Sequence, residues 1–137
     1  MAKEILDVGP WSLFCDPAQI REEYSQFESG SAEECNCIDC LRFIDLREKA
    51  HPVEAVGILD RLGIDYHKES DLSYSGPIMP NGHEFTGSFE IFASVKEGKD
   101  KVFTVGETYK LYLMNDLDSD RIRLEFITQV FTDEDRP

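Results

Sequence analysis

The sequence is short of basic residues and has no long apolar run. It carries 14 Lys and Arg against 28 Asp and Glu, a formal net charge of −14 over 137 residues. Nucleic acids and anionic membranes both attract basic surfaces, so this charge disfavours either as a partner. The charged start Met1-Ala2-Lys3-Glu4 precedes no apolar run of signal-peptide length, and nowhere do roughly 18 uncharged apolar residues follow one another. We expect a cytoplasmic protein that binds no nucleic acid and no membrane.

A complete catalytic motif is also lacking. The chain has no glycine-rich phosphate loop and no metalloprotease spacing. Its three histidines, His51, His67 and His83, stand near no Ser and Asp arrangement typical of a hydrolytic triad. These absences lean against an enzyme. The excess of acidic residues serves solubility or, alternatively, a surface that captures a basic protein.

The composition is that of one ordinary folded domain. The chain length matches the commonest domain size, and the 41% of hydrophobic residues approaches the globular average once the 9 glycines are added. No repeat, low-complexity tract or long linker divides the chain. We expect a single α+β domain over residues 1-137, in which N-terminal helices pack on one face of a C-terminal antiparallel β-meander.

Turn and cap residues mark the first elements. The apolar segment Ile5–Cys15 is typical of a short strand or extended arm with a turn at Gly9-Pro10. Asp16-Pro17 predicts the start of a helix through Tyr24, because Asp is a good N-cap and Pro is tolerated at the first helical position.

Two further helices are predicted in the middle of the chain. Asn36 is a plausible N-cap for the first, which ends near Ala50. The second begins at Pro52 and ends at Gly63, a residue suited to the left-handed cap position. Their buried stripes are predicted at Cys37, Cys40, Leu41 and Ile44, and at Val56, Leu59 and Leu62.

After Asp71 the apolar period changes from helical to two, which predicts strands. These are expected over Phe85–Val95, Val102–Val105, Tyr109–Met114 and Ile122–Val130, with polar turns at 96–101 and 115–120 and a further hairpin turn at Asn81-Gly82. Pro77 and Pro80 shorten any strand before that hairpin. The side chains expected to face the helices are Phe85, Phe89, Ile91, Leu111, Leu124 and Phe126.

The cysteines form one cluster above background. Cys35, Cys37 and Cys40 lie within six residues of a chain that we expect in a reducing compartment, where thiols or metal ligands are favoured over disulfides. Thiolates bind zinc, copper(I) and iron-sulfur clusters. Zinc sites usually combine two closely spaced pairs, and a second pair is missing here. A fourth ligand must come from Cys15, which is one candidate, or from His51, His67 or His83.

Two other interpretations of the cluster stay open. Free cysteine is among the most buried residue types, so Cys37 and Cys40 also suit an apolar helix stripe. A redox or nucleophilic thiol is the third interpretation, because a helix N-terminus lowers a thiol pKa, although Glu33, Glu34 and Asp39 act in the opposite direction.

The run Cys35-x-Cys-x-x-Cys-x-x-Phe43, followed by Leu59-x-x-Leu62-Gly-Ile-Asp65, resembles a family of uncharacterised bacterial proteins. That family carries Cys-x-Cys-x-x-Cys-x-Asn-Phe, a helix ending in Leu-Gly-Ile-Asp, and a glycine-rich aromatic strand with a Trp and a His. The likeness spans roughly residues 11–95 and implies no known activity. This sequence departs from the family at three positions, having Arg42 for the Asn, and Ser88 and Glu90 for the Trp and His.

The sequence therefore favours a non-enzymatic binding or interaction protein of the bacterial cytoplasm, with an acidic surface that captures a basic protein. The alternative is a small metal-binding protein, with zinc as the ion, or a thiol-redox protein, either of which would use Cys35, Cys37 and Cys40. A third hypothesis is a subunit with a ligand pocket between helices and sheet.

Overall fold

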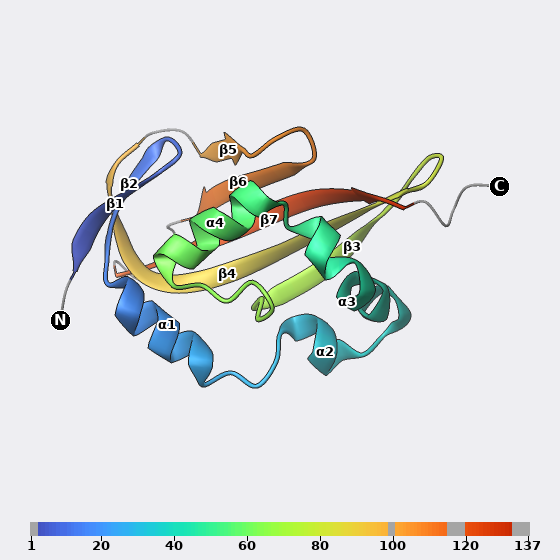
Figure 1. Ribbon diagram of the computed structural model, residues 1–137, viewed down its shortest axis with the longest axis horizontal. Coiled ribbons are helices and arrows are strands. Elements are labelled where there is room, and N and C mark those ends of the chain that lie inside the picture. Colours follow the sequence, from blue (N-terminus) through green and yellow to red (C-terminus); the bar gives the residue numbers. More distant parts are fainter. Residues whose placement is uncertain (1–2, 99–100, 115–119, 133–137) are drawn as a thin grey trace.

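A computed structural model describes residues 3–98, 101–114 and 120–132 of the chain (Figure 1). This part forms an α+β fold with one antiparallel sheet, as expected. Residues 99–100 of the predicted turn at 96–101 and residues 115–119 of the turn at 115–120 lie outside the described residues, as does the acidic end after residue 132. The elements in chain order are β1 (Glu4–Val8), β2 (Trp11–Cys15), α1 (Pro17–Ser25), α2 (Ser31–Cys35), α3 (Ile38–Ala50), α4 (Val53–Leu62), β3 (Asp71–Ile78), β4 (Gly82–Glu97), β5 (Val102–Thr104), β6 (Tyr109–Met114) and β7 (Arg121–Phe131).

The sheet is centred on the long strand β4. Its order is β1-β2-β4-β7-β6-β5, and β3 pairs with the first half of β4 while β2 pairs with its end. Only β5, β6 and β7 form a meander, because β7 returns to pair with β4 from Gly82 to Phe92. This register places Phe89 opposite Leu124, so the apolar positions of the two longest strands share one face. The expectation of one continuous meander after the helices is therefore corrected. The N-terminal strands β1 and β2, which precede the helices in the chain, also belong to the sheet.

Several local predictions are confirmed. The β1–β2 hairpin turns at Gly9, and the carboxylate of Asp16 accepts hydrogen bonds from the N–H groups of Ala18 and Gln19 at the start of α1. Helix α4 ends at Gly63, whose φ of 89° lies in the left-handed region. The side chains predicted to be in the core, Phe85, Phe89, Ile91, Leu111, Leu124 and Phe126, are all fully buried.

The predicted face of α3 is only partly right, because Cys40 is buried as expected but Cys37 and Leu41 are not. Cys37 is exposed and Leu41 is 46% exposed, whereas the side chain of Phe43, also on α3, is fully buried. The ring of Phe43 lies 5.0 Å from that of Phe85. The large aromatic side chain thus sets the rotation of the helix, because it has the most apolar area to bury. The buried residues of α3 are Cys40, Phe43, Leu46, Arg47 and Ala50.

Two short elements were not predicted. Asn36 does not cap α3: it closes the five-residue helix α2 with a φ of 60°, and Cys37 takes the N-cap position of α3. Strand β3 continues to Ile78 through Pro77, which an edge strand tolerates because β3 pairs with β4 alone. On α4, Ala55 replaces Val56 in the buried stripe.

Helices and sheet are joined by buried contacts, and in Figure 1 helix α4 lies in front of the sheet while α1 and α2 lie below it. The hydroxyl of Tyr24 on α1 donates to the carbonyl of Glu90 at 2.9 Å, and that of Thr128 on β7 donates to the carbonyl of Ala50 at 2.6 Å. No helix in the described ranges has the length and apolar character needed to cross a membrane.

Candidate metal centre

The three clustered cysteines meet where α2 gives way to α3. Cys35 is the last residue of α2, and the left-handed Asn36 turns the chain so that Cys37 caps α3 and Cys40 follows one turn later. The three Sγ atoms lie within 4.8 Å of one another. A Zn–S bond of about 2.3 Å places the sulfurs of a tetrahedral site about 3.8 Å apart. Small side-chain rotations are therefore enough to bring these sulfurs onto one ion.

The three thiols are not equivalent. Cys35 and Cys37 are exposed, whereas Cys40 is buried, and none of them forms a disulfide. The N–H of Cys40 donates to Sγ of Cys37 at 3.5 Å, and this bond, assisted by the thiols of Cys35 and Cys40, lowers the pKa of Cys37. Burial raises the pKa of Cys40 to about 12, and the neighbouring sulfurs add to that rise. The exposed thiol of Cys37 thus ionises more readily than the buried thiol of Cys40.

Cys15 does not join the group. It is fully buried on β2, and burial, with smaller contributions from Glu4 and Asp16, raises the pKa of its thiol to about 11. Among the described residues, the group contains only Cys35, Cys37 and Cys40. Cys15 therefore does not supply the fourth ligand that the sequence left open.

The three histidines are engaged elsewhere. His51 is buried in the core with Nδ1 2.8 Å from the Tyr109 hydroxyl, and His83 has Nδ1 2.8 Å from the Tyr74 hydroxyl. His67 contacts Asp65 at 2.9 Å and Glu48 at 3.1 Å. His51 is therefore a core residue. None of the three supplies a nitrogen to the cysteine group.

No family model, curated protein or solved structure matches this chain. The resemblance to an uncharacterised bacterial family stays a prediction from the cysteine spacing.

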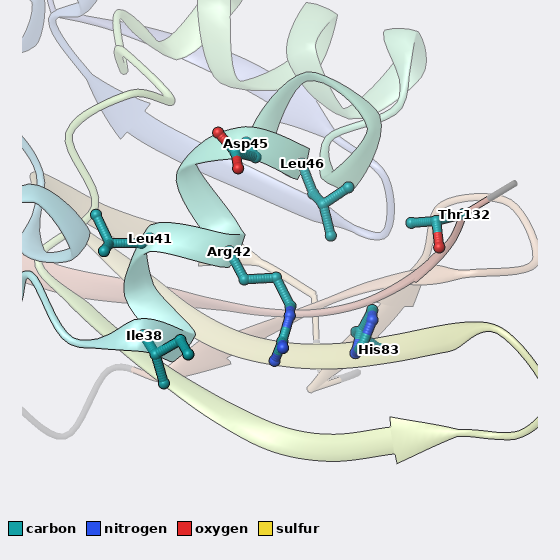
Figure 2. Close-up of a pocket in the computed structure, with 7 residues that line it drawn as sticks. All are labelled: Ile38, Leu41, Arg42, Asp45, Leu46, His83 and Thr132. Carbon is teal, nitrogen blue, oxygen red and sulfur yellow. The ribbon is translucent and has the colours of Figure 1, made fainter. Parts of the chain in front are cut away.

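A hollow of about 380 Å³ lies between α3 and the strands (Figure 2). The guanidinium of Arg42 lies 5.5 Å from the ring centroid of Tyr74 and pairs with Asp39 at 3.4 Å. Arg42 is the one basic residue of α3 that lines this hollow, and its guanidinium is already engaged within the protein. The hollow is lined by Ile38, Leu41, Arg42, Asp45, Leu46, His83 and Thr132.

Proposed function

We propose that this chain is a small metal-binding protein whose Cys35, Cys37 and Cys40 hold a soft or borderline cation, with zinc as the leading ion. The observation that carries the proposal is the approach of three sulfur atoms to within 4.8 Å at one helix junction. In the described part of the chain, no other group of three or more His, Cys, Asp or Glu ligand atoms approaches in this way. Thiolate sulfur is the ligand that selects zinc and copper(I).

Packing does not account for the cluster. A cysteine that serves only as a small apolar side chain is expected to be buried, yet two of these three are exposed. A bound cation would also offset the repulsion between neighbouring thiolates. The acidic residues Glu34 and Asp39, next to the cluster in sequence, favour a cation further.

Metal analysis of the untagged protein, purified without chelator, tests the proposal. We expect about one equivalent of zinc, with the four thiols reduced when they are titrated in denaturant. Reconstitution of the apoprotein with Co²⁺ should produce thiolate-to-cobalt charge-transfer absorption. Cys37→Ser should weaken binding sharply, and Cys15→Ser, which changes a cysteine outside the group, is the matched control.

Two results would oppose the proposal. Less than about a tenth of an equivalent of metal, with no Co²⁺ absorption after reconstitution, removes metal binding as a function. A disulfide between two of the three cysteines in protein isolated under trapping conditions favours the thiol-redox alternative instead.

We propose, second, that the acidic surface captures a basic protein in the cytoplasm. The excess of 28 Asp and Glu over 14 Lys and Arg supports this proposal. Charge of one sign speeds encounter with the opposite sign and keeps nucleic acids away. The proposal requires no catalytic group, and its test is the salt-dependent capture given in the Discussion.

A further inference from the structure

We propose that the three-cysteine group is a transfer site, which presents its cation to a thiolate supplied by another molecule at the fourth coordination position. This inference rests on the proposed metal binding and states what that binding is for. Three observations support it, and each concerns a different property of the site.

The first observation is the number of ligands. Structural zinc sites are closed by four protein ligands, whereas zinc sites with three protein ligands keep one position for an incoming group. The described residues bring three sulfurs together and add no fourth side chain to the group. A cation held here has one position left for a ligand from outside.

The second observation is access. Cys35 and Cys37 are exposed, so two of the three metal–sulfur bonds would face solvent. Ile38 beside them is 74% exposed and Leu41, one turn after Cys37, is 46% exposed. Large apolar side chains at this level of exposure provide contact area for an incoming molecule next to the sulfurs.

The third observation is that the junction is held in place by protein contacts. The guanidinium of Arg47 on α3 binds the carboxylate of Glu33 on α2 at 2.6 and 3.0 Å and that of Glu69 at 3.1 and 3.3 Å. Glu69 also accepts the N–H of Ala32 at 2.9 Å. Structural zinc supplies folding energy that the chain otherwise lacks. Here charge-assisted hydrogen bonds already fix α2 against α3.

The chemistry of the incoming ligand follows from the same site. A fourth sulfur matches three sulfurs in softness. The net charge of −14 repels carboxylate donors, whereas a thiol approaches neutral and loses its proton on binding. The new metal–sulfur bond forms, the bond to an exposed cysteine then breaks, and the freed thiolate takes up a proton. The metal keeps its oxidation state throughout.

Spectroscopy of the Co²⁺-loaded protein tests the open position. Addition of 2-mercaptoethanol should raise the charge-transfer absorption by about a third, because four Co–S bonds replace three. Cys15→Ser protein should respond in the same way as the wild type. An unchanged spectrum at saturating thiol shows that the fourth position is closed and overturns the inference.

Transfer kinetics provide the second test. Zinc-loaded protein is mixed with a four-cysteine zinc-ribbon peptide, and the transfer rate should rise in proportion to peptide concentration, because the acceptor enters before the metal leaves. A rate independent of peptide concentration overturns the inference while leaving the proposed metal binding intact. A protein that binds no metal at all would contradict the proposed function itself. Failure of metal binding and failure of direct transfer are therefore distinguishable.

The apoprotein supplies a third readout. After removal of the metal it should keep its near-ultraviolet circular dichroism and a cooperative unfolding transition, because Arg47, Glu33 and Glu69 hold the junction. Loss of that signal on chelation would identify a structural site and contradict the transfer role. Leu41→Asp should slow transfer to the peptide several-fold at unchanged metal content, whereas Val53→Asp, an exposed apolar position on α4, should not.

Discussion

Arg47 and Glu69 form an ion pair inside the protein, in which Nη2 of Arg47 lies 3.1 and 3.3 Å from the two carboxylate oxygens of Glu69. Both residues are almost fully buried. The pair joins α3 to the segment before β3, and through Glu33 and Ala32 it also fixes α2. Removal of either charge should destabilise the fold, because the desolvation of the remaining buried ion is then no longer compensated by its partner.

The first prediction concerns this pair. Arg47→Met should lower the free energy of unfolding by about 3–5 kcal/mol, because Glu69 is left buried without its partner. The double variant Arg47→Met with Glu69→Leu should recover much of that loss, since no unpaired ion remains in the interior and Glu33, the other partner of Arg47, is 33% exposed and can be hydrated. Urea unfolding of both variants measures the difference. Equal stability of the single and double variants would contradict the buried pair as described.

The second prediction concerns pH. Burial, assisted by the charge of Arg47, lowers the pKa of His51 from 6.5 to about 3. Below pH 6.5 the unfolded chain binds a proton at this position and the folded chain does not. The free energy of unfolding should therefore fall as pH drops from 6.5, by up to about 1.4 kcal/mol per pH unit from this one group. The effect is absent above pH 6.5.

Urea unfolding between pH 5 and 8 measures this slope. His51→Gln cannot titrate, so its unfolding free energy should depend less on pH between 5 and 6.5. His83→Gln is the control, because His83 is only partly buried. A His51→Gln protein with the same slope as the wild type would show that His51 does not carry the effect.

The third prediction compares the replacement by Ala of two glycines, Gly63 at the C-cap of α4 and Gly57 within that helix. A Cβ at Gly63 would collide with the backbone carbonyl oxygen of Pro17, and the φ of 89° is unfavourable for any other residue. Gly63→Ala should therefore cost at least about 1–2 kcal/mol. At Gly57 the new methyl group would meet no atom within 4 Å outside its chain neighbours and the backbone of its own helix, so Gly57→Ala should stabilise the helix by about 0.5–1 kcal/mol. Thermal unfolding compares the two, and a neutral Gly63→Ala would refute the close approach.

The fourth prediction concerns the core. Phe89 is fully buried, and its ring lies 5.5 Å from that of Phe126. Phe89→Ala should cost about 3–5 kcal/mol, because it removes a large side chain and leaves a cavity. Phe131→Ala, at the end of β7 and 44% exposed, should cost much less. Similar losses for the two variants in urea unfolding would show that the core is placed wrongly.

The fifth prediction concerns the acidic surface. If the chain captures a basic protein, pull-down from a native lysate should recover it at low salt and release it as ionic strength rises, because exposed charges are screened beyond about 8 Å at physiological salt. Mass spectrometry identifies the captured protein. A partner recovered equally well at low and high salt, or no basic protein at low salt, would remove this proposal.

The sequence alone determined the features that depend on a few neighbouring residues. Asp16-Pro17 starts α1 and Gly63 ends α4, because an N-cap carboxylate and a left-handed glycine act within one turn of the backbone. The two-residue alternation identified the buried faces of β4 and β7, since successive strand side chains point to opposite sides. The cysteine spacing likewise identified the candidate ligands.

Only the tertiary structure decided which face of α3 is buried and how the sulfurs meet. The sequence predicted one stripe on α3 that included Cys37 and Leu41, and the packing of Phe43 against Phe85 instead buries a face that leaves Cys37 exposed. The left-handed Asn36 placed Cys35 beside Cys37 and Cys40, and no local signal predicted α2. Cys15 and the three histidines were separated from the group by long-range packing. Such packing depends on contacts between residues far apart in the chain, which local periodicity does not encode.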